Sequence, residues 1–192
     1  MRPLFKTLVG WVFLVLAFPF AACAGFGRWK PLYILFSQFL SHGPGLPGDY
    51  FRRGFYCLTL KRFSFENRIG MGSCFAHPCA EVAPFAAIGE GCLLGMVTLG
   101  ERAIIASRVQ VLSGFRQHAR NPEGKLTEEG RFEMIHIGAD AWIGAGSVVM
   151  ADVGERATVA AGSVIFRKVP ADVAVAGNPA RIIDERRAEQ KG

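Results

Sequence analysis

The run Ile137-Gly-Ala-Asp-Ala-Trp-Ile-Gly-Ala-Gly-Ser-Val-Val149 decides the fold of this 192-residue chain. In it an aliphatic residue followed by glycine recurs every six residues, and a small residue stands four places after the aliphatic one. The same pattern extends outward from Ile69 to Val175, with clear members at Leu94 and Val159. A repeat this short cannot bury its own apolar face, so neighbouring repeats must stack to build a continuous core.

Each six-residue repeat predicts one short strand and one turn. The aliphatic and small residues point into a narrow interior, and glycine permits the tight corner between strands. Apolar positions six residues apart do not stay on one stripe of an α-helix, so a helical reading is disfavoured. The spacing alone therefore predicts an all-β parallel solenoid, without giving its handedness.

The same residues resemble the hexapeptide-repeat acyltransferases. The resemblance rests on the run quoted above, on the run from Val159 to Val164 and on the closing Val175-Ala-Gly-Asn-Pro-Ala-Arg181. It covers residues 69–183 and implies a left-handed parallel β-helix of about five coils. It also implies a homotrimer that moves an acetyl group from acetyl-CoA to a hydroxyl or an amine.

Four segments are expected along the chain. Residues 1–45 form an apolar, helical, membrane-associating segment, and residues 46–68 form a junction that caps the first coil. Residues 69–183 form the β-helix, which is interrupted by a loop at 114–134, and residues 184–192 form a tail.

The apolar stretch from Thr7 to Gly27 is long enough to span a bilayer, whereas Pro31 to Leu40 is too short. Three interpretations stay open: a retained membrane anchor, a cleaved secretory signal, and a segment buried in the protein's own oligomer. Acyl-CoA is cytosolic, so the resemblance favours the anchor. The expected location is the inner (cytoplasmic) membrane, with the catalytic domain facing the cytoplasm.

Composition limits the partners. Lys and Arg number 22 against 16 Asp and Glu, which gives a formal net charge of +6. This charge suits CoA phosphates, a lipid-linked glycan or an anionic membrane surface. No nucleic-acid-binding motif is present, and nucleic acid is not an expected partner.

The positions of the cysteines indicate burial in the core and do not indicate a metal site. Cys79 and Cys92 fall on small-residue positions of their repeats, which predicts that both are buried. Cys74, His77 and Cys79 are spaced like metal ligands, but no second ligand pair accompanies them. No metal is therefore expected.

The pattern stops from Gly114 to Met134, in a charged stretch whose Asn-Pro and Glu-Gly steps indicate a loop. A loop this long in a compact repeat protein is usually functional or disordered. His118 stands just inside its start. The resemblance implies that a histidine in an extruded loop, at the junction between subunits, acts as general base. Imidazole titrates near neutral pH and can accept the proton of an attacking hydroxyl or ammonium.

The alternative for His118 is a solvated loop histidine. The other histidines are weaker candidates: His136 is expected to point outward from a strand, and His77 to lie at a corner. His42 belongs to the junction region. The residue that would orient His118 cannot be chosen among the polar side chains of the loop, which are Asn121, Glu123, Glu128, Glu129 and Glu133.

The resemblance further implies a cofactor tunnel along the last coils. Trp142 matches an aromatic residue at the pantetheine arm, although packing between subunits is the alternative. Small residues are expected to let the pantetheine arm of CoA lie along the coil, and basic residues are expected to bind the CoA phosphates. The alternative for the basic residues is that they form only a solvated, positively charged end of the solenoid. The residues are Gly144, Ala145 and Ala161 for the arm, and Arg167, Lys168 and Arg181 for the phosphates.

The expected function is an acetyl-CoA-dependent O- or N-acetyltransferase that acts on a saccharide or a lipid-linked glycan, in exopolysaccharide or surface-glycan synthesis. Two alternatives stay open: a non-catalytic trimeric β-helix scaffold and a γ-type carbonic anhydrase. The latter needs three histidines converging on one metal, and the four histidines here show no close pairing in neighbouring strands. A generic repeat does not identify the acceptor.

Overall fold

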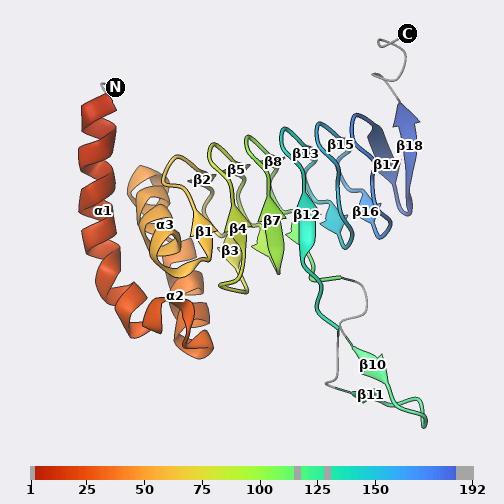
Figure 1. Cartoon of the computed structure of the whole chain (residues 1–192), viewed down its shortest axis with the longest axis horizontal. Helices are drawn as coiled ribbons and strands as arrows, with labels where there is room; N and C mark the ends of the chain where they lie inside the picture. Colours follow the sequence, from red (N-terminus) through yellow and green to blue (C-terminus); the bar gives the residue numbers. More distant parts are fainter. Residues whose placement is uncertain (1–2, 115–117, 128–130, 185–192) are drawn as a thin grey trace.

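The computed structural model describes residues 3–114, 118–127 and 131–184 as a parallel β-solenoid closed at its N-terminal end by helices (Figure 1). Each turn of the solenoid passes through three faces, which we name after their β12, β13 and β14 strands. On the β12 face, Val153 and Val169 of the last turns form only isolated bridges. The β13 face holds six parallel strands, one per turn, so the solenoid has about six turns where the repeat predicts about five.

The three faces have the following strands. The β12 face contains β1 (Arg62–Phe63), β4 (Glu81–Val82), β7 (Val97–Leu99) and β12 (Ile135–Ile137). The β13 face contains β2 (Arg68–Ile69), β5 (Ala87–Ile88), β8 (Ile104–Ile105), β13 (Trp142–Ile143), β15 (Thr158–Val159), β17 (Ala174–Gly177) and the antiparallel β18 (Ala180–Asp184). The β14 face contains β3 (Cys74–Phe75), β6 (Leu93–Leu94), β9 (Gln110–Val111), β14 (Val148–Val149) and β16 (Val164–Ile165).

The predicted interior is confirmed. Val82, Leu99 and Ile137 lie in register on successive turns and are almost fully buried, while small residues such as Ala103 and Ala141 are completely buried. The core is therefore a column in which each layer packs on the next, as a stacked repeat requires.

One cysteine assignment was wrong. Cys92 is buried as predicted, but Cys79 is only half-buried in a turn. Ala80, which is completely buried, takes the interior position instead. The inward residues Phe75 and Val82, on either side of His77 and Pro78, are seven residues apart instead of six, so the repeat slips by one position there.

Glycines at the corners let neighbouring turns approach closely. A Cβ atom at Gly100 would lie 2.3 Å from the backbone nitrogen of Ala139 and 2.6 Å from the carbonyl carbon of Gly138. Both obstructing atoms belong to the backbone of the next turn, which cannot move without separating the layers.

Replacing Gly100 with alanine is therefore expected to lower the free energy of unfolding by about 1–3 kcal/mol, as overpacking does. Gly146→Ala is the control, because a Cβ there meets nothing within 4 Å and adds only the cost of a positive φ (+69°). Urea unfolding followed by circular dichroism measures both variants. A loss at Gly100 no larger than at Gly146 would contradict the close-approach argument.

Helices cap the first turn. They are α1 (Pro3–Cys23), the short 3₁₀ helix η1 (Gly25–Gly27), α2 (Lys30–Ser41) and α3 (Gly45–Thr59). Aromatic side chains join the cap to the first coil: Tyr56 of α3 packs edge-on against Phe75 of β3 with ring centroids 5.0 Å apart. The segment expected as a junction (46–68) thus contains most of α3 and also β1, which already pairs with β4.

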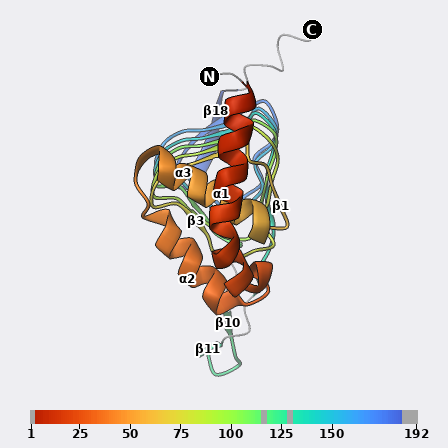
Figure 2. The ribbon, with the colours of Figure 1, turned by 90° about the vertical axis from the view of Figure 1, so that its left-hand side faces the viewer.

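The expected membrane anchor, and with it the location at the inner membrane, is corrected by the structure. Among the described residues, no helix combines the length and the apolar character needed to cross a membrane. The apolar run instead supplies a helix contact, in which α1 packs across α3 and lies in front of it in Figure 2. Its Phe13 and Ala17 approach Gly54 so closely that a Cβ there would lie 2.6 Å from the Phe13 carbonyl oxygen.

Candidate active site

The interruption of the repeat forms an extruded hairpin. It leaves the solenoid between β9 and β12, at the corner where the β14 and β12 faces meet, and pairs β10 (Ala119–Arg120) with β11 (Leu126–Thr127) in antiparallel fashion (Figure 1). Its turn is fixed by Asn121, whose Oδ1 accepts a hydrogen bond from the Lys125 backbone at 2.9 Å. The loop expected from the sequence therefore contains regular structure.

His118 lies immediately before β10 and is exposed to solvent. Within the described residues, no hydrogen bond reaches its imidazole. Of the expected orienting partners, Asn121 is engaged in the turn and Glu133 forms an ion pair with Arg131 at 3.4 Å. Glu128 and Glu129 lie outside the described residues.

The segment that returns from the loop to β12, residues 131–134, contacts the solenoid body. The Glu133 backbone N–H donates to the Ser113 carbonyl at 3.0 Å, which closes the base of the loop. One residue earlier, the Phe132 ring packs against the His77 ring, with centroids 5.9 Å apart. Burial, reinforced by the positive charge of Lys30, lowers the pKa of His77.

Trp142 lies on the outer surface of the β13 face, where 52% of its side chain is exposed. It stands in register between Ile104 of β8, which is also half-exposed, and Thr158 of β15. Each turn runs from the β13 face to the β14 face and then to the β12 face, so the hairpin corner is opposite the β13 face. Seen along the solenoid, the hairpin lies at the bottom and β18 of the β13 face at the top (Figure 2). The structure therefore does not bring Trp142 and His118 together within one chain.

The corner between the β13 and β14 faces holds Gly144 and Ala145, which follow Trp142 closely in the sequence, and Ala161, which lies on the next turn. Gly144 is buried, and a Cβ there would lie 2.5 Å from the Ala161 nitrogen, so coil stacking alone requires this glycine. Ala145 and Ala161 are exposed, and the Ala145 carbonyl accepts a hydrogen bond from Gly162 at 2.8 Å.

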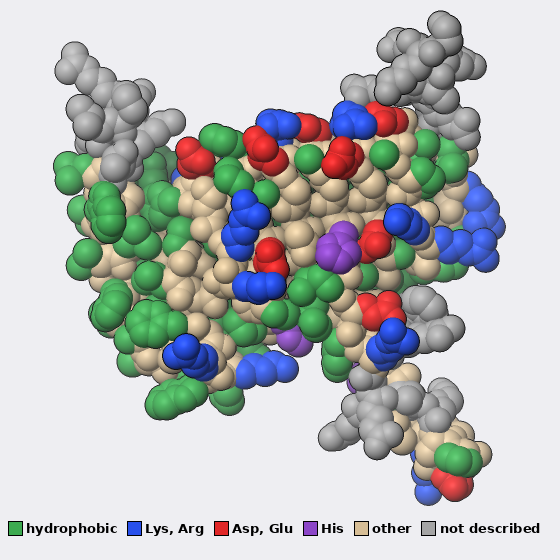
Figure 3. Space-filling model, viewed as in Figure 1, with side chains coloured by type: hydrophobic (Ala, Val, Ile, Leu, Met, Phe, Trp, Pro, Cys, Tyr) green, Lys and Arg blue, Asp and Glu red, His purple; other side chains and the backbone are tan. Residues whose placement is uncertain are grey.

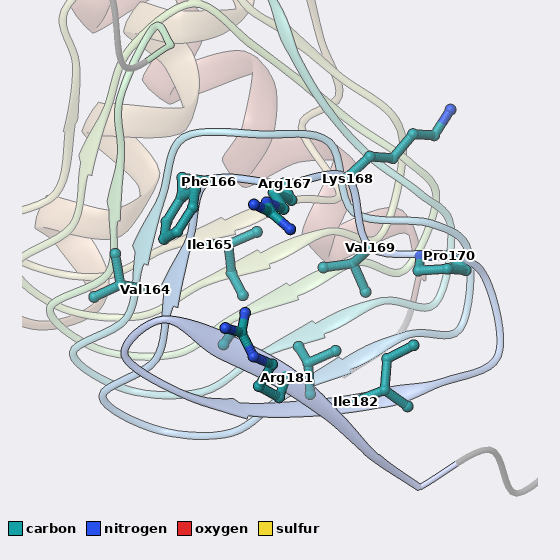
Figure 4. A pocket seen from close by; sticks show the side chains of 11 residues that line it. Val164, Ile165, Phe166, Arg167, Lys168, Val169, Pro170, Arg181 and Ile182 are labelled. Carbon is teal, nitrogen blue, oxygen red and sulfur yellow. The ribbon is translucent and has the colours of Figure 1, made fainter.

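Arg167, Lys168 and Arg181 line one small pocket at the C-terminal end of the solenoid (Figure 4). Its volume is about 90 Å³, and its floor is formed by β16 residues and by β18. None of the three cations forms an ion pair with another described residue. A ligand pocket usually measures about 300–1,000 Å³, so one chain does not enclose a cofactor here.

Two features of this region were not predicted from the sequence: the His77–Phe132 contact and the pairing of β18 with β17 that builds the pocket. Neither contact follows a repeating spacing in the sequence from which it could have been predicted. Among the described residues, no group of three or more His, Cys, Asp or Glu side chains is placed to hold a metal ion, so Cys74, His77 and Cys79 do not form a ligand set.

Comparison with known proteins identifies the repeat. Residues 134–167 match the family described as bacterial transferase hexapeptide (six repeats). This part of the chain carries the repeat of the hexapeptide-repeat acyltransferase superfamily. The matched residues include the run that carries Trp142 and Gly144, and they end at Arg167.

The chain is 37% identical over 121 residues to serine acetyltransferase 2 of Arabidopsis thaliana. The match covers 54% of the chain and 32% of the relative. The chain thus spans about a third of the length of that relative. Its fold is similar to a maltose O-acetyltransferase from Clostridium difficile 630 (TM-score 0.66, 18% identity, 79% of this chain and 83% of that one). It is also similar to a galactoside acetyltransferase in complex with coenzyme A (TM-score 0.55, 19% identity, 85% and 86% covered).

Proposed function

We propose that the protein is an acetyl-CoA-dependent acetyltransferase that acetylates a hydroxyl or an amine of a saccharide. The observation that carries the proposal is the position of His118, at the start of a hairpin extruded from an otherwise regular hexapeptide solenoid. The superfamily and the serine acetyltransferase relative support acetyl transfer, and the maltose and galactoside acetyltransferases make a saccharide acceptor reasonable.

The active site in this proposal lies between two copies of a homotrimer. His118 and Trp142 are on opposite sides of one chain, so they can share a site only when the hairpin of one copy reaches the β13 face of the next. Such a head-to-tail contact closes into a ring when three copies are related by a threefold axis. It would also cover the exposed side chains of Ile104 and Trp142.

Acetyl-CoA would bind along the corner beside Trp142. Ala145 and Ala161 expose small side chains there, which leaves room for the pantetheine arm. Arg167, Lys168 and Arg181 would hold the phosphates, because they are cations without carboxylate partners among the described residues. Charge-assisted hydrogen bonds to phosphate are stronger than neutral ones, and Arg can make them in pairs.

His118 would act as the general base. Its imidazole removes the proton from the acceptor hydroxyl, or from an ammonium, as the oxygen or nitrogen bonds to the thioester carbonyl carbon. Backbone N–H groups stabilise the negative oxygen that forms. When the C–S bond breaks, the imidazolium returns the proton to the CoA thiolate, so a hydroxyl acceptor gives the acetylated acceptor and CoA. An ammonium acceptor gives the same products and releases one further proton to water. No covalent acyl-enzyme is needed.

Titration calorimetry with CoA and acetyl-CoA tests the donor site, and release of free thiol during incubation with saccharides tests transfer. A surface-glycan or exopolysaccharide role is tested by mass spectrometry of glycan from cells with and without the protein, as a difference of one acetyl group. The absence of both heat and a thermal shift with CoA would overturn the proposal.

Trp142→Ala is expected to raise the Kd for CoA about tenfold, which corresponds to about 1.4 kcal/mol, and to leave the trimer intact in sedimentation. The aromatic ring would be lost from the pantetheine arm, whereas the rest of the interface would remain. Ile104→Ala, one strand away on the same face, is the matched control and should change the Kd less than about twofold. If Trp142→Ala instead yields monomers, Trp142 serves subunit packing.

A further inference from the structure

A notch opens below the β12 face, between α2 and the extruded hairpin (Figures 1 and 3). Lys30 stands at the start of α2 on one side, and Phe132 at the returning base of the loop on the other. His77 lies between them: its ring packs on Phe132, and its titration is affected by the charge of Lys30. The corner turn that carries His77 therefore forms the roof of the notch.

The walls of this notch carry different chemistry. Phe132 keeps 49% of its side chain exposed, although its ring already contacts His77 at a tilt of 53°. Glu133 and Arg131 form an exposed ion pair beside it. On the α2 side, Lys30 is exposed and makes no ion pair with any described carboxylate.

We propose that this notch is the acceptor subsite, and that it takes a saccharide bearing a carboxylate or a phosphate. The sugar ring would pack on the open face of Phe132, and the anionic group would meet Lys30 and His77. The proposal rests on the proposed function, because the hairpin that carries His118 starts from the same loop base.

The charge balance of the notch favours an anion. The only other lysine near this corner, among the described residues, is Lys61, and its ammonium is already paired with Glu81 at 2.5 Å. Lys30 keeps its charge uncompensated, and both burial and Lys30 hold His77 in its neutral form near pH 7. A bound carboxylate or phosphate would offset the charge of Lys30, and charge-assisted hydrogen bonds of this kind are about twice as strong as neutral ones.

With the acceptor in this notch, the acceptor and acetyl-CoA would bind to different copies of the chain in the trimer. The acceptor would bind to the chain whose hairpin supplies His118, whereas acetyl-CoA would bind to the β13 face of the neighbouring copy. A base located between the two is placed to take a proton from one and return it to the other.

Binding is tested first, without acetyl-CoA, by the imidazole NMR signals of the full chain. The probes are methyl glucuronide, glucose 6-phosphate and the neutral methyl glucoside, and the His77 signal is assigned from the His77→Gln spectrum. The two anionic probes should raise the pKa of His77 and saturate, whereas methyl glucoside should not. If no probe moves the His77 signal, or if all three move it equally, the subsite is wrong.

Lys30→Gln should weaken the binding of both anionic probes about tenfold and leave methyl glucoside unchanged. Arg68→Gln is the matched control, since it removes the same charge from the opposite, β13 face. Phe132→Tyr should keep the affinity that Phe132→Ala loses, because a ring is retained. An equal loss in Lys30→Gln and Arg68→Gln would show only long-range charge attraction and would overturn the proposal.

The two proposals fail separately. If calorimetry finds no CoA binding, the proposed function fails whatever the NMR shows. If CoA binds and acetyl transfer proceeds but the KM is the same for charged and neutral acceptors, only the subsite fails. Lys30→Gln should raise the KM for anionic acceptors with kcat within about twofold, because Lys30 would bind and not react.

Discussion

Replacing His118 with alanine is expected to lower kcat for acetyl transfer by about 10²–10⁴-fold, the usual contribution of a general base. The Kd for CoA should stay within about twofold, because the donor would contact the β13 face and the C-terminal pocket instead. Release of free thiol from acetyl-CoA in the presence of a saccharide acceptor measures the rate, and calorimetry measures the binding.

His136→Ala is the matched control for this experiment. His136 projects outward from β12, in register with Thr98 of β7, and is not part of the hairpin. Its loss should change kcat by less than about threefold, in the range of ordinary surface substitutions. Undiminished acetyl transfer by His118→Ala would show that His118 is a solvated loop residue.

Mixed trimers make the same prediction sharper, because they test where the two halves of the site come from. Coexpressed His118→Ala and Trp142→Ala chains should form trimers in which about a quarter of the sites combine an intact His118 with an intact Trp142 from the next copy, if the chains mix at random. If both residues acted within one chain, no site in the mixture would be intact. At acetyl-CoA concentrations well below the Kd of Trp142→Ala, where that variant is nearly inactive, recovery of activity above that of either variant alone therefore supports the site between copies.

The regular part of the fold was predictable because its contacts are local and periodic. Leu99 and Ile137 repeat the same environment one turn apart, so the phase of the pattern fixes which side chains point inward. The phase shifts at corners whose length departs from six residues, as at Cys79, where the inward residues Phe75 and Val82 are seven residues apart. The prediction that the N-terminal apolar segment is a membrane anchor was wrong. Hydropathy measures how apolar a segment is, but it does not reveal that Phe13 and Ala17 pack against Gly54 of another helix.

The candidate site was predictable in its sequence position and not in its surroundings. An interruption of a periodic pattern locates His118, but it does not reveal a hairpin or the packing of Phe132 on His77 from the first coil. That contact joins residues far apart in the chain with no shared spacing. The separation of Trp142 from His118, by contrast, follows from strand order alone: an insertion between the second and third strands of a turn must lie opposite the first.

Arg52 is the residue whose loss should cost the fold most. Its side chain on α3 is only 2% exposed, and its Nε donates to the Ile69 carbonyl at 3.0 Å. Its Nη1 donates to Gly43 at 2.7 Å and, at 3.3–3.4 Å, to the carbonyls of Ser41 and Leu40 at the end of α2. This burial lowers the pKa of Arg52. One guanidinium thus joins α2, α3 and the first strand of the β13 face.

Arg52→Ala is therefore expected to lower the free energy of unfolding by about 3–5 kcal/mol, because it removes several hydrogen bonds from a charged donor, which contribute about 1.5–3 kcal/mol each. Arg52→Met keeps most of the volume but no donor, and it should lose nearly as much, because the carbonyls of Ile69 and Gly43 would stay buried without a partner. Arg68→Met, on an exposed strand position, is the control and should change stability by less than about 0.5 kcal/mol. Urea unfolding measures all three. A loss below 1 kcal/mol in Arg52→Ala would contradict this role. In a stacked repeat each layer is held by its neighbours, so a cap released at β2 exposes the first layer of the core, and the solenoid should then open from that end.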